Sequence, residues 1–267
     1  MSFLFDHFVH VVNDPQKAME RCEELGIHAV QGGKHVNLGT YNALSYFGLS
    51  YIEFIGVFSE QLANEAAKVD HGLIKSILDA KEDGAVRVAL RSTDLQADAQ
   101  RFASLGFEVN GPTDFSRTRP DGSIIKWKLL FIGREGISPE LPFFIEWDES
   151  DEWRKKDLEK SNAIADHPIG DIALESIGFA VNNGAETAAS WSELLDVELG
   201  TPFIDSELQA KGYPIRIAGG NLIFYEPTDN GKAASFLQSK GEKPFMVQFS
   251  SGERKTIDFS GALYRFE

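Results

Sequence analysis

The strongest constraint on this chain is an order of strand and helix patterns that occurs more than once. Residues 5–12 (FDHFVHVV) alternate as a strand does, and Asp14-Pro15 then marks the start of a helix that Gly26 ends. Three strand-like runs follow, at 28–31, 39–47 and 50–58. This segment therefore predicts a β-α-β-β-β module.

A second copy of the same order begins at residue 85. Residues 85–91 have a strand pattern, and a helix over 95–105 follows the cap signal Thr93-Asp94. Strand candidates then lie at 107–109, 124–132 and 142–147. His7 and Arg87 hold matching positions, because each stands seven residues before the aspartate that starts its helix.

The rest of the chain favours a third module and part of a fourth. A strand at 172–181, a helix at 185–195 and a hairpin over 213–225 repeat the order, with Ser176 at the position of His7. The tail from 244 reads as a degraded fourth module without its helix. The charged segment 148–171, with a connecting surface helix at 153–160, marks a boundary. We expect paired modules in 1–150 and the third and fourth in 151–267.

These modules predict an α+β fold, in which repeated βαβββ units form curved mixed β-sheets, or cup-shaped half-barrels, with helices packed outside. Strand parity then decides which side chains can meet inside a cup. His7 on the first strand and Glu53 on the fourth point to the same interior, and Glu146 has the placement of Glu53 in the second module. A carboxylate within such an apolar strand is costly to bury unless it is paired or coordinated.

A histidine and glutamates on separate strands are suitable ligands for a divalent metal ion such as Zn, Fe, Mn, Ni or Co. The spacing leaves two other interpretations open. A strand histidine is often a hydrogen-bonded core residue, and a strand glutamate often faces solvent.

Composition restricts the classes of partner. The 267 residues are 42% hydrophobic, enough for one large core or two smaller ones, and the net charge is −15. Such an acidic chain should repel nucleic acid and anionic membranes. Cys22 has no partner for an internal disulfide, no apolar run approaches a membrane span, and the N-terminus lacks a signal-peptide pattern. We expect a cytoplasmic location.

Several segments together resemble the glyoxalase-like domain family of the vicinal oxygen chelate superfamily. The first-module signature is FDHFVHVVND followed by YIEFIGV some forty residues later. The more specific segments are GGKHVNLGTYNAL (32–44), RTRPDGSIIKWKLLF (117–131), LPFFIEWD (141–148) and HPIGDIALESIGFAV (167–181). The resemblance covers roughly residues 3–182.

The resemblance implies one divalent metal ion held by His7, Glu53 and Glu146, with Glu53 or Glu146 able to transfer a proton. One departure is that Arg87 stands where the second module would supply its histidine, and arginine cannot ligate a metal. Arg87 could instead form an ion pair with Glu146 or Glu53 and replace the metal. His35 or His167 could supply a further ligand.

Other residues near the expected cup are candidates for binding a substrate. His35 and Asn42 could orient a substrate oxygen or simply complete turn and strand-end hydrogen bonds. Arg119 and Arg87 are suited to a carboxylate or phosphate, although Arg119 could equally be a solvated hairpin residue. Trp127 neighbours a lysine on its strand, and only one of the two should face the cup.

Two functional hypotheses follow. The first is a metal-dependent lyase, isomerase or dioxygenase that acts on a small oxygen-rich molecule. The second is a metal-free protein of the same fold that binds or sequesters a small molecule. Modules of this kind pair within one chain or across a homodimer, and the sequence is compatible with both arrangements.

Overall fold

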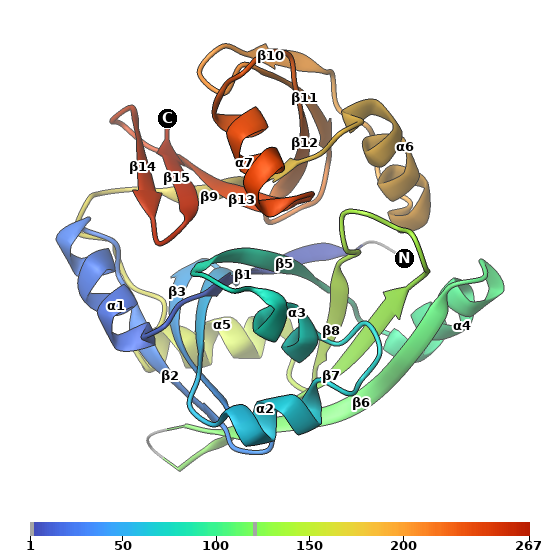
Figure 1. Cartoon of the computed structure of the whole chain (residues 1–267). Coiled ribbons are helices and arrows are strands. Elements are labelled where there is room, and N and C mark those ends of the chain that lie inside the picture. The colour runs from blue at the N-terminus through green and yellow to red at the C-terminus, as the bar shows by residue number, and fades with distance from the viewer. Residues whose placement is uncertain (1–2, 120–121) are drawn as a thin grey trace.

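The computed structural model describes residues 3–119 and 122–267, which form two curved mixed sheets with helices around them (Figure 1). The predicted α+β fold of curved sheets is confirmed. The first module consists of β1 (Leu4–Val11), α1 (Pro15–Glu24), β2 (Val30–His35), β3 (Thr40–Phe47) and β4 (Ser50–Val57). After α2 (Glu60–Ala66) and α3 (Leu73–Asp79), the second consists of β5 (Gly84–Arg91), α4 (Leu95–Ser104), β6 (Glu108–Thr118), β7 (Ile124–Gly133) and β8 (Phe143–Trp147).

Helix α5 (Asp151–Lys160) then leads to the second sheet. Its elements are β9 (Ala173–Ala180), α6 (Gly184–Leu195), β10 (Phe203–Asp205), β11 (Ala210–Ile215), β12 (Asn221–Pro227), α7 (Lys232–Lys240), β13 (Lys243–Ser250), β14 (Lys255–Phe259) and β15 (Ala262–Phe266). Three of these features were not expected from the sequence. They are α7, the short β10 and the full length of β6, a largely exposed strand with few apolar residues. Pro120 and Asp121, part of the segment with the family resemblance, lie outside the described residues.

The same cap starts the helix of each complete module. The side chains of Asp14, Asp94 and Asn183 accept hydrogen bonds from backbone N–H groups in the first turn of α1, α4 and α6, at 3.0, 3.0 and 3.2 Å. Such caps satisfy amide groups that the helix itself leaves unpaired. Gly26 and Gly106, with φ of +71° and +78°, follow the ends of α1 and α4, where a left-handed residue reverses the chain.

The strand order explains how the modules pair. The first sheet runs β2-β3-β4-β1-β5-β8-β7-β6, so two modules meet where β1 pairs antiparallel with β5. The second sheet runs β10-β11-β12-β9-β13-β15-β14 and is joined in the same way through β9 and β13. In both sheets the first strand of a module pairs parallel with its last strand, as β1 does with β4.

The largest hydrophobic core lies between the two sheets. It combines Phe8, Phe54 and Phe144 of the first sheet with Phe179 and Phe224 of the second, and residues of α1, α4 and α6 complete it. These side chains are turned away from the interior of the first cup, so the core supports the cup from behind. None of the described helices is long and apolar enough to cross a membrane.

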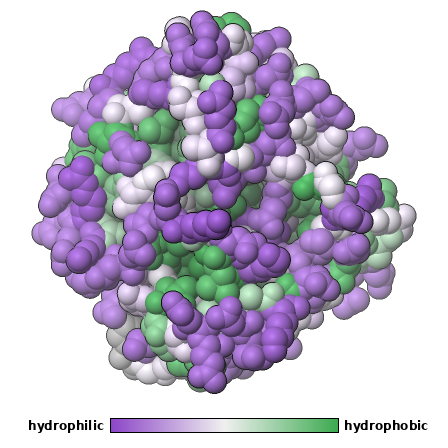
Figure 2. Space-filling model, in the orientation of Figure 1, coloured by the Kyte–Doolittle hydropathy of each residue, from purple (hydrophilic) through white to green (hydrophobic). Residues whose placement is uncertain are grey.

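The concave faces of the two sheets are covered differently. Helix α7 packs its Ala233, Phe236 and Leu237 against apolar residues of the second sheet, including Ile223 and Phe245 (Figure 1). On the first sheet, α3 and α5 contribute only part of the lining of a cavity. The face of the molecule shown in Figure 2 is mostly hydrophilic, and hydrophobic residues show mainly in recesses between the elements.

Candidate functional site

The concave face of the first sheet encloses a cavity of about 550 Å³. Its lining comes from both modules and from α3 and α5. The structure brings six of the predicted site residues to this cavity, namely His7, His35, Asn42, Glu53, Arg119 and Trp127. Arg87 and Glu146 are not part of its lining. Of these six residues, His7, His35, Asn42 and Glu53 come from the first module, and Arg119 and Trp127 come from the second.

His7 lies at the base of the cavity with a carboxylate near each ring nitrogen. Its Nδ1 is 2.7 Å from Oδ1 of Asp6, and its Nε2 is 3.7 Å from Oε2 of Glu53. The ring stacks on Tyr51 with a centroid distance of 4.6 Å. Because a carboxylate accepts, the Nδ1–H must donate to Asp6, which leaves Nε2 as the atom facing Glu53.

Asp6 was not predicted, because adjacent residues of a regular strand point to opposite faces. The pairing of β1 with β5 shifts between Phe5 and His7, so Asp6 is the extra residue of a bulge. A bulge redirects side chains locally, and here it lets Asp6 reach the side of the sheet on which His7 lies. The only signal of Asp6 in the sequence is an acidic residue within an apolar strand, next to a histidine.

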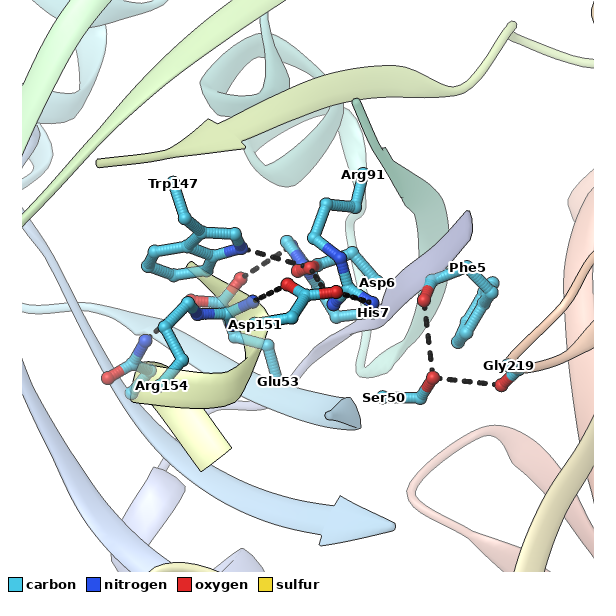
Figure 3. Close-up of polar contacts among 11 residues, drawn as sticks. Phe5, Asp6, His7, Ser50, Glu53, Arg91, Trp147, Asp151, Arg154 and Gly219 are labelled. Carbon is cyan, nitrogen blue, oxygen red and sulfur yellow. Dashed lines mark hydrogen bonds and ion pairs between the residues drawn. The ribbon is translucent and has the colours of Figure 1, made fainter. Parts of the chain in front are cut away.

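Asp6 is fully buried and holds three donors (Figure 3). Besides His7, its Oδ2 accepts hydrogen bonds from Nε1 of Trp147 at 3.0 Å and Nη1 of Arg91 at 3.2 Å. Burial alone would raise the pKa of Asp6. The hydrogen bond from His7 and the nearby positive charges outweigh burial and lower this pKa to about 2. Asp6 is thus a fixed negative charge behind His7.

Glu53 is held in place by a hydrogen bond from Asn42. Its Oε1 accepts a hydrogen bond from Nδ2 of Asn42 at 2.5 Å, and Oδ1 of Asn42 accepts from the Gly33 N–H at 2.9 Å and from Nη1 of Arg117 at 3.0 Å. Glu53 is 6% exposed. These contacts fix the carboxylate so that Oε2 remains directed to His7.

The glycine pair before His35 makes room for the contacts of Asn42. Gly32 and Gly33 belong to strand β2. A Cβ on Gly32 would lie 2.0 Å from Oδ1 of Asn42 and 2.7 Å from Nη1 of Arg117. The missing side chain therefore leaves the space in which Nη1 of Arg117 bonds to Oδ1 of Asn42, the residue that holds Glu53.

His35 is a neutral group in this cavity. Its Nδ1 is 3.0 Å from Oγ1 of Thr40, and its ring meets Trp127 edge-on at 6.1 Å. Burial lowers the pKa of His35 to about 4, although the negative charge of Glu53 acts in the opposite direction. His167, the other histidine that the sequence offers as a ligand, lies outside the lining of the cavity. Its ring nitrogens contact the backbone of His28 and Tyr46.

Glu146 is not brought together with His7 and Glu53. On β8, Phe143, Ile145 and Trp147 face the cavity, so the alternation of the strand turns Glu146 to the opposite side. There it accepts hydrogen bonds from the Leu95 N–H at 2.7 Å and from Lys128 at 3.1 Å. Glu146 supports the start of α4 instead of the cup.

Strand register identifies the true counterpart of Glu53 in the second module. In the first module Val9, two residues after His7, pairs with Glu53. In the second module Ala89, two residues after Arg87, pairs with Phe143. The second module therefore offers Arg87 and Phe143 where the first offers His7 and Glu53.

Arg87 does not form the expected ion pair with either glutamate. It is 2% exposed, and its guanidinium donates to the carbonyl oxygens of Leu141, at 2.7 and 3.1 Å, and His71, at 2.5 Å. It also lies 5.6 Å from the ring centre of Phe143. Arg87 ties the segments before α3 and before β8 to the sheet, and its hydrogen bonds are used there.

The donor atoms do not fit the three-ligand metal centre that the family resemblance implied. His7 and Glu53 face each other, but Glu146 is on the other side of β8. Within 3–119 and 122–267, no group of three or more His, Cys, Asp or Glu residues could hold a metal ion. What the residues do provide is a buried pair, His7 and Glu53, whose Nε2 and Oε2 atoms face each other at 3.7 Å.

The walls of the cavity are largely apolar and aromatic. Trp127 stacks with Phe115 at a centroid distance of 6.4 Å and contacts Trp147 at 5.7 Å. Arg119 also lines the cavity, and its Nη2 is 2.5 Å from Oδ2 of Asp157 on α5. A ligand here would meet flat apolar surfaces on its sides and polar groups at its base.

Comparisons with known proteins agree with this architecture. A family model described as "Glyoxalase-like domain" matches residues 5–195. A hypothetical protein from Staphylococcus aureus is similar over 99% of both chains, with a TM-score of 0.80 and 24% identity. A variant of 4-hydroxymandelate synthase from Streptomyces coelicolor has a TM-score of 0.59 and 14% identity, covering 95% of this chain and 72% of that one. At these identities the two structures show the fold alone.

One protein with a similar sequence is described as an RNA helicase. The ATP-dependent RNA helicase ROK1 of Lodderomyces elongisporus is 30% identical over 173 residues. That match covers 61% of this chain and 30% of the helicase, so the chain spans less than a third of that protein.

Proposed function

Because this chain belongs to the glyoxalase-like domain family of the vicinal oxygen chelate superfamily, we propose that its first cup is the active site of an isomerase or lyase. The substrate is a small oxygen-rich molecule, and the reaction is a proton transfer at a carbon next to an oxygen-bearing carbon. The observation that supports this most is the facing of His7 and Glu53 at 3.7 Å at the base of the cavity.

The hydrogen-bond partners of His7 and Glu53 suit a proton transfer. Asp6 accepts from Nδ1 of His7 and so fixes the tautomer and stabilises the ring when it is protonated. Asn42 holds one oxygen of Glu53, leaving the other for a substrate proton. As Glu53 takes the proton from carbon, His7 donates a proton from Nε2 to the substrate oxygen. In the second half of the reaction Glu53 returns its proton to carbon and His7 takes its proton back from the oxygen. A well-placed acid or base of this kind contributes about 10²–10⁴-fold to a rate.

A metal-dependent version of the reaction, and a dioxygenase in particular, needs more ligands than His7 and Glu53 provide. The proposed reaction therefore involves no metal ion. The expected consequence is that the reaction survives chelation of divalent metal ions. An activity that disappears with a chelator and returns with Zn²⁺, Mn²⁺, Co²⁺, Ni²⁺ or Fe²⁺ would contradict this part of the proposal.

The test follows the proton itself. The protein is incubated in D2O with a panel of small 2-oxo and 2-hydroxy carboxylic acids, and replacement of C–H by C–D is followed by proton NMR. Glu53→Gln should lower the exchange rate by at least about 100-fold. Glu146→Gln is the matched control, since this glutamate lies outside the cavity and should leave the rate unchanged. Equal rates in wild type and Glu53→Gln, or no exchange with any compound, would refute the proposal.

A second candidate is a protein that binds or sequesters a small molecule without changing it. The aromatic walls formed by Trp127, Phe115 and Phe143 favour it, as does the absence of a histidine–glutamate pair in the second module. This candidate predicts saturable binding without deuterium exchange, and binding that is insensitive to Glu53→Gln.

A further inference from the structure

Helix α5, which the sequence suggests is only a connector, contributes a buried cation to the cup. Arg154 lines the cavity and is 6% exposed, although it lies on a helix with mostly charged residues. Leu158, one turn later, packs with Tyr46 and Tyr51 of the cup and so holds α5 on the sheet. The position of Arg154 is therefore fixed by packing.

The guanidinium of Arg154 is also fixed in orientation. Its Cζ lies 4.0 Å from the centre of the Trp147 ring, in the geometry of a cation–π contact. Trp147 is itself held through its Nε1 hydrogen bond to Asp6. Arg154 thus stacks on Trp147, which lines the cavity and donates to Asp6, the carboxylate behind His7.

The charge of Arg154 is only partly neutralised. Its Nη1 is buried and has no hydrogen-bond partner in the part of the chain that the structure describes. An oxygen of Asp151 lies 3.5 Å away, but Asp151 is 45% exposed and its other oxygen pairs with Arg91 at 3.2 Å (Figure 3). A buried polar group without a partner is uncommon and expensive in a folded protein.

The other two arginines of the cavity are already engaged. Arg117 donates to Asn42, and Arg119 is paired with Asp157. Their donors therefore serve to position Glu53 and to join the β6–β7 hairpin to α5. Arg154 is left as the arginine whose buried donor can take an acceptor from a ligand.

We infer that Arg154 binds a carboxylate group of the ligand, and that the ligands of this cup are small carboxylic acids with an apolar or aromatic body. A planar guanidinium matches a carboxylate through two parallel hydrogen bonds, and such bonds are strong in a site shielded from water. The apolar body then lies along the Trp127 wall. This inference rests on the proposed function for the location of the site, but it concerns binding and requires no turnover.

The experiment compares two probes of nearly equal shape, phenylacetate and its neutral amide phenylacetamide, by isothermal titration calorimetry. Wild-type protein should bind the acid at least about 10-fold more tightly than the amide, as a hydrogen bond to a charged group predicts. Arg154→Met and Arg154→Gln should both abolish this preference while leaving the affinity for the amide within about 2-fold of wild type. Arg134→Met is the matched control, because Arg134 caps the end of α4 through the Leu105 and Gly106 carbonyls.

Three results would overturn the inference. They are equal affinities of wild-type protein for the two probes, a preference for the acid that survives both Arg154 variants, and no binding of either probe. The outcome is separate from the deuterium-exchange test. Exchange that depends on Glu53 together with no preference for the acid would remove only the role of Arg154. A preference that depends on Arg154 without any exchange would remove only the enzymatic proposal.

Discussion

Acid should destabilise this protein through a histidine at the junction of its two sheets. His10 on β1 is fully buried, and its Nε2 donates to the Ser260 carbonyl at 3.0 Å. Its Nδ1 therefore accepts from the Tyr264 hydroxyl at 2.9 Å. Burial lowers the pKa of His10 from 6.5 to about 4, although the Ser260 hydrogen bond and the charge of Asp258 act in the opposite direction.

The sign and size of the effect follow from this shift. Between pH 6.5 and about 4 the unfolded chain binds a proton at residue 10 that the folded chain does not, so folding stability falls as the pH falls through that window. Each unit of pKa difference corresponds to about 1.4 kcal/mol. His10 alone should therefore cost about 3 kcal/mol of unfolding free energy between pH 7 and pH 4.

The assay is urea unfolding at several pH values from 7 to 4, for wild type and His10→Gln. The variant should be less stable at pH 7 because the buried hydrogen bonds are altered. Its unfolding free energy should fall less steeply as the pH falls, because unfolding of the variant takes up about one proton fewer. His35 and His167 have pKa values shifted in the same direction and contribute equally to both proteins, so they cancel in the comparison. The same pH slope in both proteins would refute the reasoning.

Three other changes test features of the fold and the site. Glu146→Gln should lower the stability by about 1 kcal/mol through a weaker bond to the Leu95 N–H, measured by urea unfolding, with no change in ligand affinity. Gly32→Ala should weaken ligand binding or slow exchange, seen by calorimetry or NMR, because its Cβ would displace Asn42. Tyr225→Phe should be neutral or stabilise by up to about 1 kcal/mol in thermal unfolding, since the Tyr225 hydroxyl is buried without a partner among the described residues.

The sequence predicted the repeated modules because alternation, helix caps and glycine stops are local signals. Asp14 and Asp94 occur at the same place in each copy, and that spacing brings His7 into register with its counterpart in the second module. Parity within regular strands also placed His7 and Glu53 on the same concave face. These are properties of short segments and do not depend on distant contacts.

The remaining site residues depend on features that alternation does not describe. Asp6 reaches the cup through a bulge, which depends on how β1 pairs with β5. Glu146 resembles Glu53 in its sequence context, but the register of β8 places Phe143 at the equivalent position. Arg154 enters the cup because a connecting helix packs back on the sheet, and such packing is a tertiary effect that the charged sequence of α5 does not indicate.

The packing of α7 against the second sheet predicts the stoichiometry of ligand binding. The chain has duplicated its curved sheet, yet Ala233, Phe236 and Leu237 fill the concave face of the second one. The described part of the chain therefore leaves one concave face for a ligand to enter. A titration should saturate at one equivalent per chain.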